Sequence, residues 1–237
     1  MKPYIGIIIA MCFLLSSCHH PASDSRLYDR GISQELAELR KQEIKDLKYD
    51  LHFAIPEEKS VPIHGEIIIT FHLDTPQEVI LDFREEPEKV ESVSANGQAA
   101  GYEFRNEHII VPQSYIKKGE NKVTIRFIAG NQSLNRNDEF LYTLLVPDRA
   151  RTLFPCIEQP NLKATFTLKL DVPSEWKAVS NTYIYKEEVK EGIKTVTFAP
   201  HRTTEHLSVL IRCRKTGAPG IHGRRSENIS LLPGNRS

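Results

Sequence analysis

The chain has no excess of charge of either sign. Its 31 lysines and arginines balance 31 aspartates and glutamates, so the formal net charge at pH 7 is +0. Nucleic acids and anionic membrane surfaces attract proteins through concentrated positive charge. The composition therefore gives no electrostatic basis for either partner, and we predict no nucleic-acid partner.

Cysteine is scarce and unevenly distributed. Of four cysteines, Cys12 and Cys18 lie close to the N-terminus, and only Cys156 and Cys213 remain for the body of the chain. An exported protein could join these two in a disulfide. We instead expect Cys156 to pack as a small buried apolar residue, because Cys213 lies in an atypical C-terminal segment.

The sequence has no His-Glu-x-x-His motif, which would place two imidazoles and a water-activating glutamate on one helix face. The histidines are His19, His20, His52, His64, His72, His108, His201, His206 and His222. The adjacent pair at 19 and 20 makes a poor metal site, and we expect His52 and His72 to be solvated on polar strand faces. No histidine lies near Cys156 in sequence to activate it as a nucleophile. We predict no cofactor, metal site or catalytic residue in this chain.

Long apolar runs are absent except at the N-terminus. Residues 5–15 follow Lys2 and are too short to span a bilayer, which is typical of an export signal. The tetrapeptide Leu15-Ser16-Ser17-Cys18 resembles the bacterial lipoprotein processing box. We predict a signal peptide at 1–18, lipidation of Cys18, a flexible tether at 19–30 and a membrane anchor facing the periplasm or the cell surface. The alternative is an ordinary signal peptide with a chance cysteine.

Hydrophobic periodicity predicts one short helix followed by many strands. Ser33 is a candidate N-cap for a helix that reaches Leu47. From Leu47 the apolar period becomes two. The predicted strands are 47–55, 63–73, 79–83, 90–94, 108–111, 123–129, 166–172, 178–185 and 195–198, with a polar loop at 131–139. The first two strands should form a hairpin, and 178–185 should pair with 195–198 around Glu191-Gly192. The fold class expected is all-β, a twisted sandwich or saddle of mostly antiparallel strands, with one domain at 31–208.

The most informative stretch is Arg151–Phe166. Pro155 and Pro160 restrict the backbone around them, so Phe154–Asn161 should be a stiff connector that leads into an alternating strand. The stretch resembles the FPCFDQPDLKATF signature in the first domain of zinc aminopeptidases of the aminopeptidase N family. The signature positions are Phe154, Pro155, Cys156, Glu158, Gln159, Pro160 and Lys163. Further similarity lies at 49–51, 140–143, 147–151, 172–173 and 176–181, so the resemblance covers roughly residues 28 to 208.

The resemblance implies a non-catalytic part of a larger enzyme. Members of this family hold zinc with His-Glu-x-x-His and a distant Glu, and they carry a Gly-Ala-Met-Glu-Asn motif; this sequence contains neither. Zinc, peptide substrate and hydrolysis would then belong to a catalytic domain that is the partner of this one.

One substrate contact is implied for the first domain itself. Members commonly carry Ser/Thr-Gln-Phe-Glu-Pro, whose polar side chains help to hold the substrate amine. This sequence has Thr143-Leu144-Leu145-Val146-Pro147, so Leu144 and Val146 replace the polar pair. They are either substrate-facing apolar residues or part of the core. Asp148 and Glu158 are likewise open to two interpretations, an acid/base pair or turn and ion-pair residues.

The C-terminal segment departs from the family pattern after Leu207-Ser208. Residues 209–215 can be encoded so that a one-base shift reads Tyr-Leu-Phe-Ala-Ala-Gly-Lys, and residues 230–237 so that it reads Leu-Phe-Tyr-Arg-Glu-Thr-Asp. Both resemble family sequence in the expected order. We therefore interpret 209–237 as a frameshifted, disordered tail, which would leave a neighbouring strand with an open edge.

Two functions follow from these observations. The first is an exported N-terminal domain fragment of a zinc aminopeptidase, inactive alone. The alternative is a stand-alone β-sandwich lipoprotein that binds a partner without catalysis, which requires a stable fold and a protected C-terminal edge.

Overall fold

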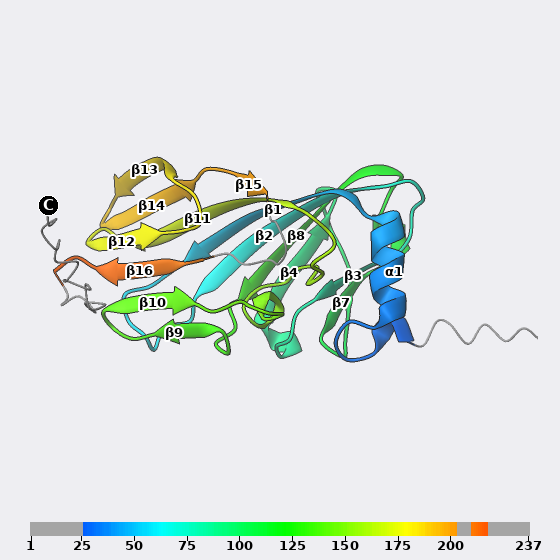
Figure 1. The fold of residues 1–237 in the computed structure, drawn as a ribbon, viewed down its shortest axis with the longest axis horizontal. Coiled ribbons are helices and arrows are strands. Elements are labelled where there is room, and N and C mark those ends of the chain that lie inside the picture. Colours follow the sequence, from blue (N-terminus) through cyan, green and yellow to red (C-terminus); the bar gives the residue numbers. More distant parts are fainter. Residues whose placement is uncertain (1–25, 203–209, 218–237) are drawn as a thin grey trace, which may run out of the picture.

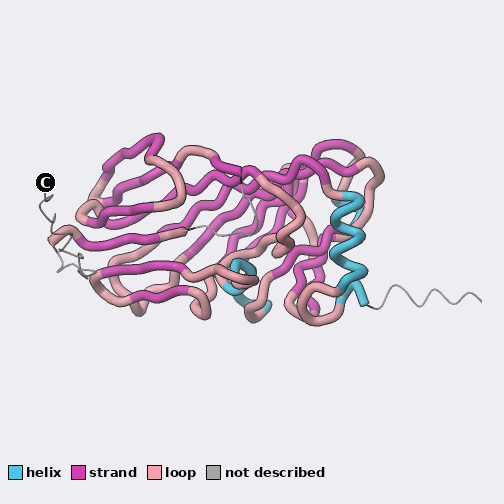
Figure 2. The backbone as a smooth tube through the Cα atoms, viewed as in Figure 1, coloured by secondary structure: helices cyan, strands magenta, loops and turns pink. Residues whose placement is uncertain are grey.

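The computed structural model of the chain describes residues 26–202 and 210–217. Within them, Gln34–Glu43 form α1, and the remaining structure is mostly strand (Figures 1 and 2). Short 3-10 turns lie at Arg26–Tyr28 (η1), Pro87–Lys89 (η2), Gln113–Tyr115 (η3) and Ala150–Thr152 (η4). The prediction of an all-β fold of mostly antiparallel strands is confirmed.

A nine-stranded sheet forms one layer of the described structure. Its order is β13-β14-β11-β1-β2-β8-β4-β5, and β15 also pairs with β11. The strands are β1 (Lys45–Ala54), β2 (His64–Leu73), β4 (Val90–Ala95), β5 (Gln98–Ala99), β8 (Gly119–Ile128), β11 (Thr165–Pro173), β13 (Ile184–Lys190), β14 (Ile193–Phe198) and β15 (His201–Arg202). The predicted hairpin of β1 and β2 is confirmed, and β1 pairs in parallel with β11.

Two smaller sheets cover the apolar face of this large sheet (Figure 1). One has the order β12-β16-β10-β9, with β9 (Leu134–Arg136), β10 (Phe140–Thr143), β12 (Trp176–Val179) and β16 (Arg212–Lys215). The other has the order β3-β7-β6, with β3 (Val79–Asp82), β6 (Glu103–Arg105) and β7 (His108–Val111). The core lies between the layers, because alternate residues of the long strands point inward. Tyr49, Phe127 and Phe166 are among its fully buried aromatic residues.

The helix begins as predicted and ends sooner. The Ser33 side chain accepts a hydrogen bond from the Leu36 backbone N–H at 3.1 Å, which confirms the N-cap. The predicted extension to Leu47 is wrong, because the backbone at Ile44 is already extended and β1 starts at Lys45. Part of the expected tether at 19–30 has defined structure: residues 26–28 form η1, and the Asp29 carbonyl lies 2.9 Å from Nε2 of His108, whereas residues 19–25 lie outside the described residues.

Two other strand predictions need correction. The predicted strand 178–185 is split, because β12 ends at Val179 and joins a smaller sheet whereas β13 starts at Ile184. The hairpin around Glu191-Gly192 is confirmed between β13 and β14, and both turn residues have positive φ. The predicted polar loop 131–139 contains a short strand, β9, which pairs with β10.

The structure also corrects the prediction for the C-terminal segment. Arg212–Lys215 form β16, which lies between β10 and β12, so neither strand has an open edge there. Ile211 and Cys213 are 2% and 0% exposed whereas Arg212 is exposed, so the segment alternates like a half-buried strand. The composition of this segment did not indicate a strand, because only two apolar residues, Ile211 and Cys213, form its inward face. Residues 218–237 lie outside the described residues.

Candidate functional site

The signature segment crosses the space between the sheets and is held mainly through its backbone. Asp82 and Cys156 exchange two backbone hydrogen bonds, of 2.7 and 3.0 Å. The Ile157 N–H donates to the Tyr49 hydroxyl at 3.0 Å, and Gln159 Nε2 donates to the Ala37 carbonyl at 2.8 Å. The segment therefore joins β1, β3 and α1, which fits the stiff connector predicted from its prolines.

The other signature side chains serve the same structural purpose. Phe154 and Cys156 are both 0% exposed, in the core. Pro155 is buried between them, whereas Pro160 is exposed and its carbonyl accepts a hydrogen bond from Lys163 Nζ at 3.1 Å. These contacts hold the connector and place no reactive group in a cleft.

A buried ionic cluster centres on Asp82. Arg40 donates to both carboxylate oxygens, and His108 Nδ1 lies 3.0 Å from Oδ1. The Glu158 N–H donates to Oδ2 at 2.9 Å. Burial would raise the pKa of Asp82, but the charge of Arg40 and the hydrogen bonds from His108 and Arg40 outweigh it and lower the pKa to about 2. Asp82 is therefore ionised at neutral pH.

Arg151 links the signature to the loop that precedes it. Its guanidinium lies 3.1 Å from Glu107 and 3.4 Å from Asp148, while its backbone N–H donates to Glu158 Oε2 at 2.9 Å. Asp148 and Glu158 thus interact with different parts of Arg151, as turn and ion-pair residues. Burial raises the pKa of Glu158 to about 7, although the hydrogen bond from the Arg151 backbone acts in the opposite direction.

Cys156 and Cys213 are both buried free thiols, so the disulfide alternative does not occur in the structure. Burial raises the pKa of Cys156 well above its usual range and that of Cys213 to about 12. A thiol with a raised pKa is a poor nucleophile at neutral pH. The prediction that Cys156 packs as a small buried residue is confirmed.

The loop after β10 carries the residues predicted to face substrate. Leu144 and Val146 are 51% and 53% exposed, whereas Leu145 between them is 4% exposed. The interpretation of Leu144 and Val146 as core residues is therefore wrong. The Leu144 N–H donates to the Ser133 carbonyl at 2.9 Å, which ties the loop to the segment before β9. The apolar side chains of Leu144 and Val146 are consequently held at the surface of the domain.

His52 and His72 are both partly exposed, and each lies near a carboxylate. His52 Nε2 lies 2.8 Å from Asp171, whose other oxygen accepts a hydrogen bond from Thr195 at 2.7 Å. His72 is the more solvated of the predicted pair, 3.7 Å from Asp74. His108 is fully buried beside Asp82. The apolar residues that follow it in β7 indicated burial for the strand, but its carboxylate partner is 26 residues away in sequence.

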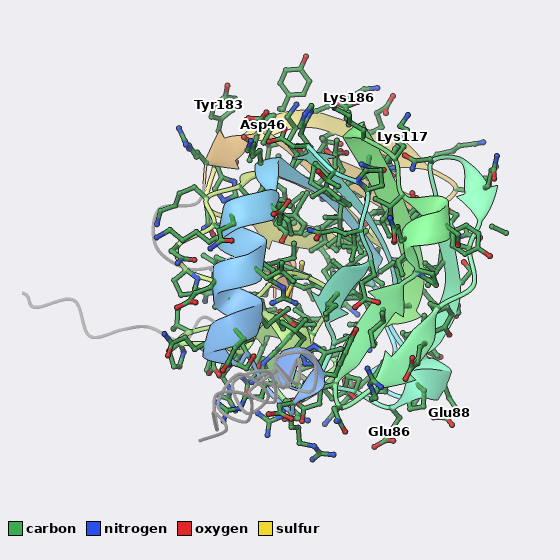
Figure 3. The ribbon with its side chains drawn as sticks, turned by 90° about the vertical axis from the view of Figure 1, so that its right-hand side faces the viewer. Asp46, Glu86, Glu88, Lys117, Tyr183 and Lys186 are labelled. Carbon is green, nitrogen blue, oxygen red and sulfur yellow. The ribbon has the colours of Figure 1, made fainter. Side chains whose placement is uncertain are left out.

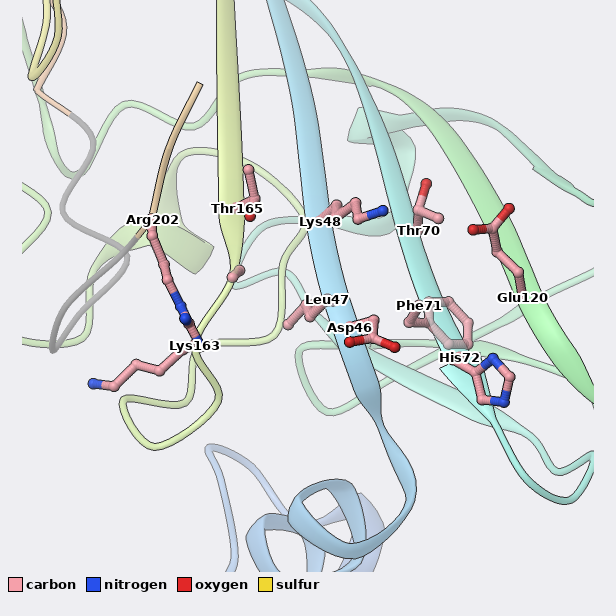
Figure 4. A pocket seen from close by; sticks show the side chains of 11 residues that line it. Asp46, Leu47, Lys48, Thr70, Phe71, His72, Glu120, Lys163, Thr165 and Arg202 are labelled. Atoms are coloured by element: carbon pink, nitrogen blue, oxygen red, sulfur yellow. The ribbon is translucent and has the colours of Figure 1, made fainter. Parts of the chain in front are cut away.

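A hollow of about 390 Å³ lies on the polar side of the large sheet, at the ends of β1, β2 and β11. Lys48 extends toward Thr70, whereas Lys163 extends away from both (Figure 4). Asp46 and Glu120 add opposite charge to the same rim. With Arg202, the lining therefore carries side chains of both signs.

In residues 26–202 and 210–217, no three His, Cys, Asp or Glu side chains are gathered so that they could hold a metal ion. The residues described here thus do not fit a resident zinc. The same ranges contain no helix of the length and apolarity that a bilayer span requires. Cys18 and the pair His19–His20 lie outside them, so the lipidation of Cys18 and the expectation of a poor metal site at His19–His20 stay predictions.

The three-sheet arrangement, with a signature connector held between the sheets, defines an all-β domain of stacked, mostly antiparallel sheets. A family model described as the Peptidase M1 N-terminal domain matches residues 45–205. The chain belongs to this family.

Relatives in sequence agree with this assignment, and solved structures show a similar fold. The chain is 47% identical over 51 residues to glutamyl aminopeptidase of Sus scrofa and 41% identical over 64 residues to aminopeptidase M1-D of Oryza sativa subsp. japonica. These matches cover 22% and 26% of this chain but only 5% and 7% of the relatives. The fold is similar to that of the M1 zinc metallopeptidase from Deinococcus radiodurans, with a TM-score of 0.59 at 20% identity, over 73% of this chain and 42% of that one.

Proposed function

We propose that the chain is the non-catalytic N-terminal domain of an exported zinc aminopeptidase and has no peptidase activity alone. In the parent enzyme, a separate catalytic domain would hold zinc and hydrolyse the N-terminal peptide bond. The observation that carries the proposal is the family match over 45–205, in a sequence without His-Glu-x-x-His.

In the parent enzyme, the exposed loop with Leu144 and Val146 would be the part of this domain that contacts substrate. We propose that it reaches the substrate pocket of the catalytic domain. An apolar pair cannot accept hydrogen bonds from the substrate ammonium as a glutamine and a carboxylate would. The loop would instead favour an apolar substrate side chain near these residues.

The proposed location is the periplasm or the cell surface, with the protein attached by a lipid on Cys18. The support is the apolar segment 5–15 and the Leu15-Ser16-Ser17-Cys18 box. Mass spectrometry of the mature chain tests this directly. A protein that starts at residue 18 and carries acyl groups is expected, and an unmodified N-terminus at another residue would contradict the lipid anchor.

The frameshift proposal is tested at the level of DNA. Sequencing across codons 200 to 237 and beyond should reveal a second frame that continues the aminopeptidase, including a His-Glu-x-x-His motif. A second frame interrupted by stop codons, or without family sequence, would contradict it. Because β16 is formed by residues of the present frame, a frameshifted product would still have β16 paired with β10 and β12.

One observation favours the second candidate, a stand-alone binding lipoprotein. The place of β16 between β10 and β12 provides the protected C-terminal edge that this function requires. Pull-down of partners with the lipid-anchored chain in membranes distinguishes the two. The first candidate predicts no specific partner, because its catalytic domain would be encoded in the other reading frame, whereas the second predicts capture of a ligand.

A further inference from the structure

The outermost strand of the large sheet, β13, is exposed along its whole length. Among the described strands it pairs with β14 alone. Tyr185 and Val189 are 72% and 62% exposed, and Tyr183 just before the strand is 73% exposed. Figure 3 shows Tyr183 and Lys186 projecting from the surface. A free strand edge with large apolar side chains is a place where another strand can add.

The charges along β13 restrict which strand can add there. Lys186 and Glu188 form an ion pair of 2.8 Å within the strand, and both side chains are more than half exposed. The register with β14 shifts between Ile184 and Lys186, so regular pairing is confined to the part of β13 from Lys186 onward. Any added strand must therefore match a short segment of alternating charge.

A second copy of β13 meets this requirement in one antiparallel register. When the two-fold axis passes through Glu187, Lys186 lies opposite Glu188 of the second copy. Directly opposed residues in antiparallel strands are neighbours, and opposite charges stabilise such pairs.

Neighbouring registers lose these contacts. An axis through Glu188 places Lys186 opposite Lys190 of the second copy, and an axis through Lys186 places the two copies of Lys186 opposite each other. Like charges directly opposed across strands are destabilising. The sequence of β13 thus selects the register centred on Glu187, with the single cost that Glu187 faces its own copy.

We propose that β13 is a homodimerisation strand, through which two copies of this chain extend their large sheets into one across a two-fold axis at Glu187. The contact is isologous, so each opposed pair occurs twice. This proposal does not depend on the peptidase family or on substrate. The short ladder makes a weak, concentration-dependent dimer.

Charge reversal tests the proposal by sedimentation equilibrium of the full chain. Lys186→Glu and Glu188→Lys should each raise the dimer Kd about 10-fold, because each creates two like-charged pairs. The double variant Lys186→Glu/Glu188→Lys should restore the original Kd, since it only exchanges the signs. Glu187→Gln should lower the Kd by removing the central repulsion. All three side chains are exposed, so circular dichroism should report unchanged folding.

Cysteine cross-linking tests the register separately, in a background with Cys12→Ser and Cys18→Ser. Glu187→Cys should form an intermolecular disulfide readily, because directly opposed Cβ atoms lie within disulfide reach. Lys190→Cys is the matched control, since its two copies would lie about 20 Å apart along the ladder. If the chain stays monomeric at about 1 mM, a second copy does not pair with β13, and the proposal is overturned. A dimer that ignores charge reversal, or that cross-links equally well at both positions, overturns it as well.

Discussion

The guanidinium of Arg40 forms a bidentate ion pair with the carboxylate of Asp82, with nitrogen–oxygen distances of 2.9 and 2.7 Å. The two side chains are 2% and 0% exposed. Arg40 also donates to the Ile80 carbonyl at 2.7 Å. Because Asp82 in turn binds His108 and the signature backbone, this pair fixes α1 against β3, β7 and the connector.

Removal of one partner of this pair should be costly. Arg40→Met leaves the buried carboxylate of Asp82 without the opposite charge of the guanidinium. Loss of one partner of a buried ion pair typically costs about 3–5 kcal/mol. Urea denaturation measures the free energy of unfolding. The matched control is Lys41→Met, on the exposed side of the same helix, which should change stability by less than about 0.5 kcal/mol. Equal effects of the two substitutions would contradict the role of the ion pair.

Glu158 should make the domain less stable at neutral pH than at mildly acidic pH. Its folded pKa of about 7 lies above the ordinary value of 4.5, so between these values the folded state binds more protons than the unfolded state. The unfolding free energy should fall by about 3 kcal/mol as pH rises from 4.5 to 7, because each pKa unit corresponds to about 1.4 kcal/mol.

Glu158→Gln isolates this contribution, because the amide stays neutral throughout that range. The difference between unfolding free energies at pH 5 and pH 8 should be smaller in the variant than in the original chain. Asp82 acts in the opposite sense at lower pH, where the stability that its depressed pKa provides is lost from 3.8 toward 2. An identical pH dependence in both proteins would show that Glu158 titrates with an ordinary pKa in the fold.

The contribution of β16 can be tested with neighbouring residues of opposite orientation. Ile211→Asn places an amide in the core beside β10 and should destabilise the domain by about 3 kcal/mol. Arg212→Asn is the control, because Arg212 is exposed, and it should change stability by less than about 0.5 kcal/mol. If both substitutions are neutral, the segment does not complete the sheet in solution.

The loop after β10 should tolerate polar substitution at the two positions proposed to face substrate. Leu144→Gln and Val146→Gln should each leave the unfolding free energy within about 0.5 kcal/mol of the original, because both side chains are half exposed. Leu145→Gln should cost about 3 kcal/mol, because the same amide would then be buried. A large loss at Leu144 or Val146 would mean that these residues pack in the core.

Strands with a strict apolar period of two were predictable from the sequence. Tyr49, Leu51 and Phe53 in β1 are buried as their alternation indicated. The same reasoning failed where tertiary pairing overrides local pattern. β16 has a polar composition, and a position between two other strands makes it a strand. The helix also ended early, because strand pairing from Lys45 competes with continuation of the helix.

The site was predictable only as a set of positions. The signature positions identified the family, but no local pattern could show that Asp82 meets Arg40 and His108, which lie 42 and 26 residues away. Burial of Glu158 and exposure of Leu144 also depend on how the sheets stack. For Leu144 and Glu158 the sequence left two interpretations open; the packing excludes a core position for Leu144 and gives Glu158 a contact with the Arg151 backbone.

The most direct test of the proposed function is an aminopeptidase assay. The purified chain, incubated with zinc and a panel of amino-acid anilides, should show no turnover. A gene corrected by one base near codon 209 should yield zinc-dependent turnover that a chelator removes. If the uncorrected chain instead shows turnover, and this activity stays with the protein through successive columns, the central claim that this domain carries no catalytic machinery is contradicted.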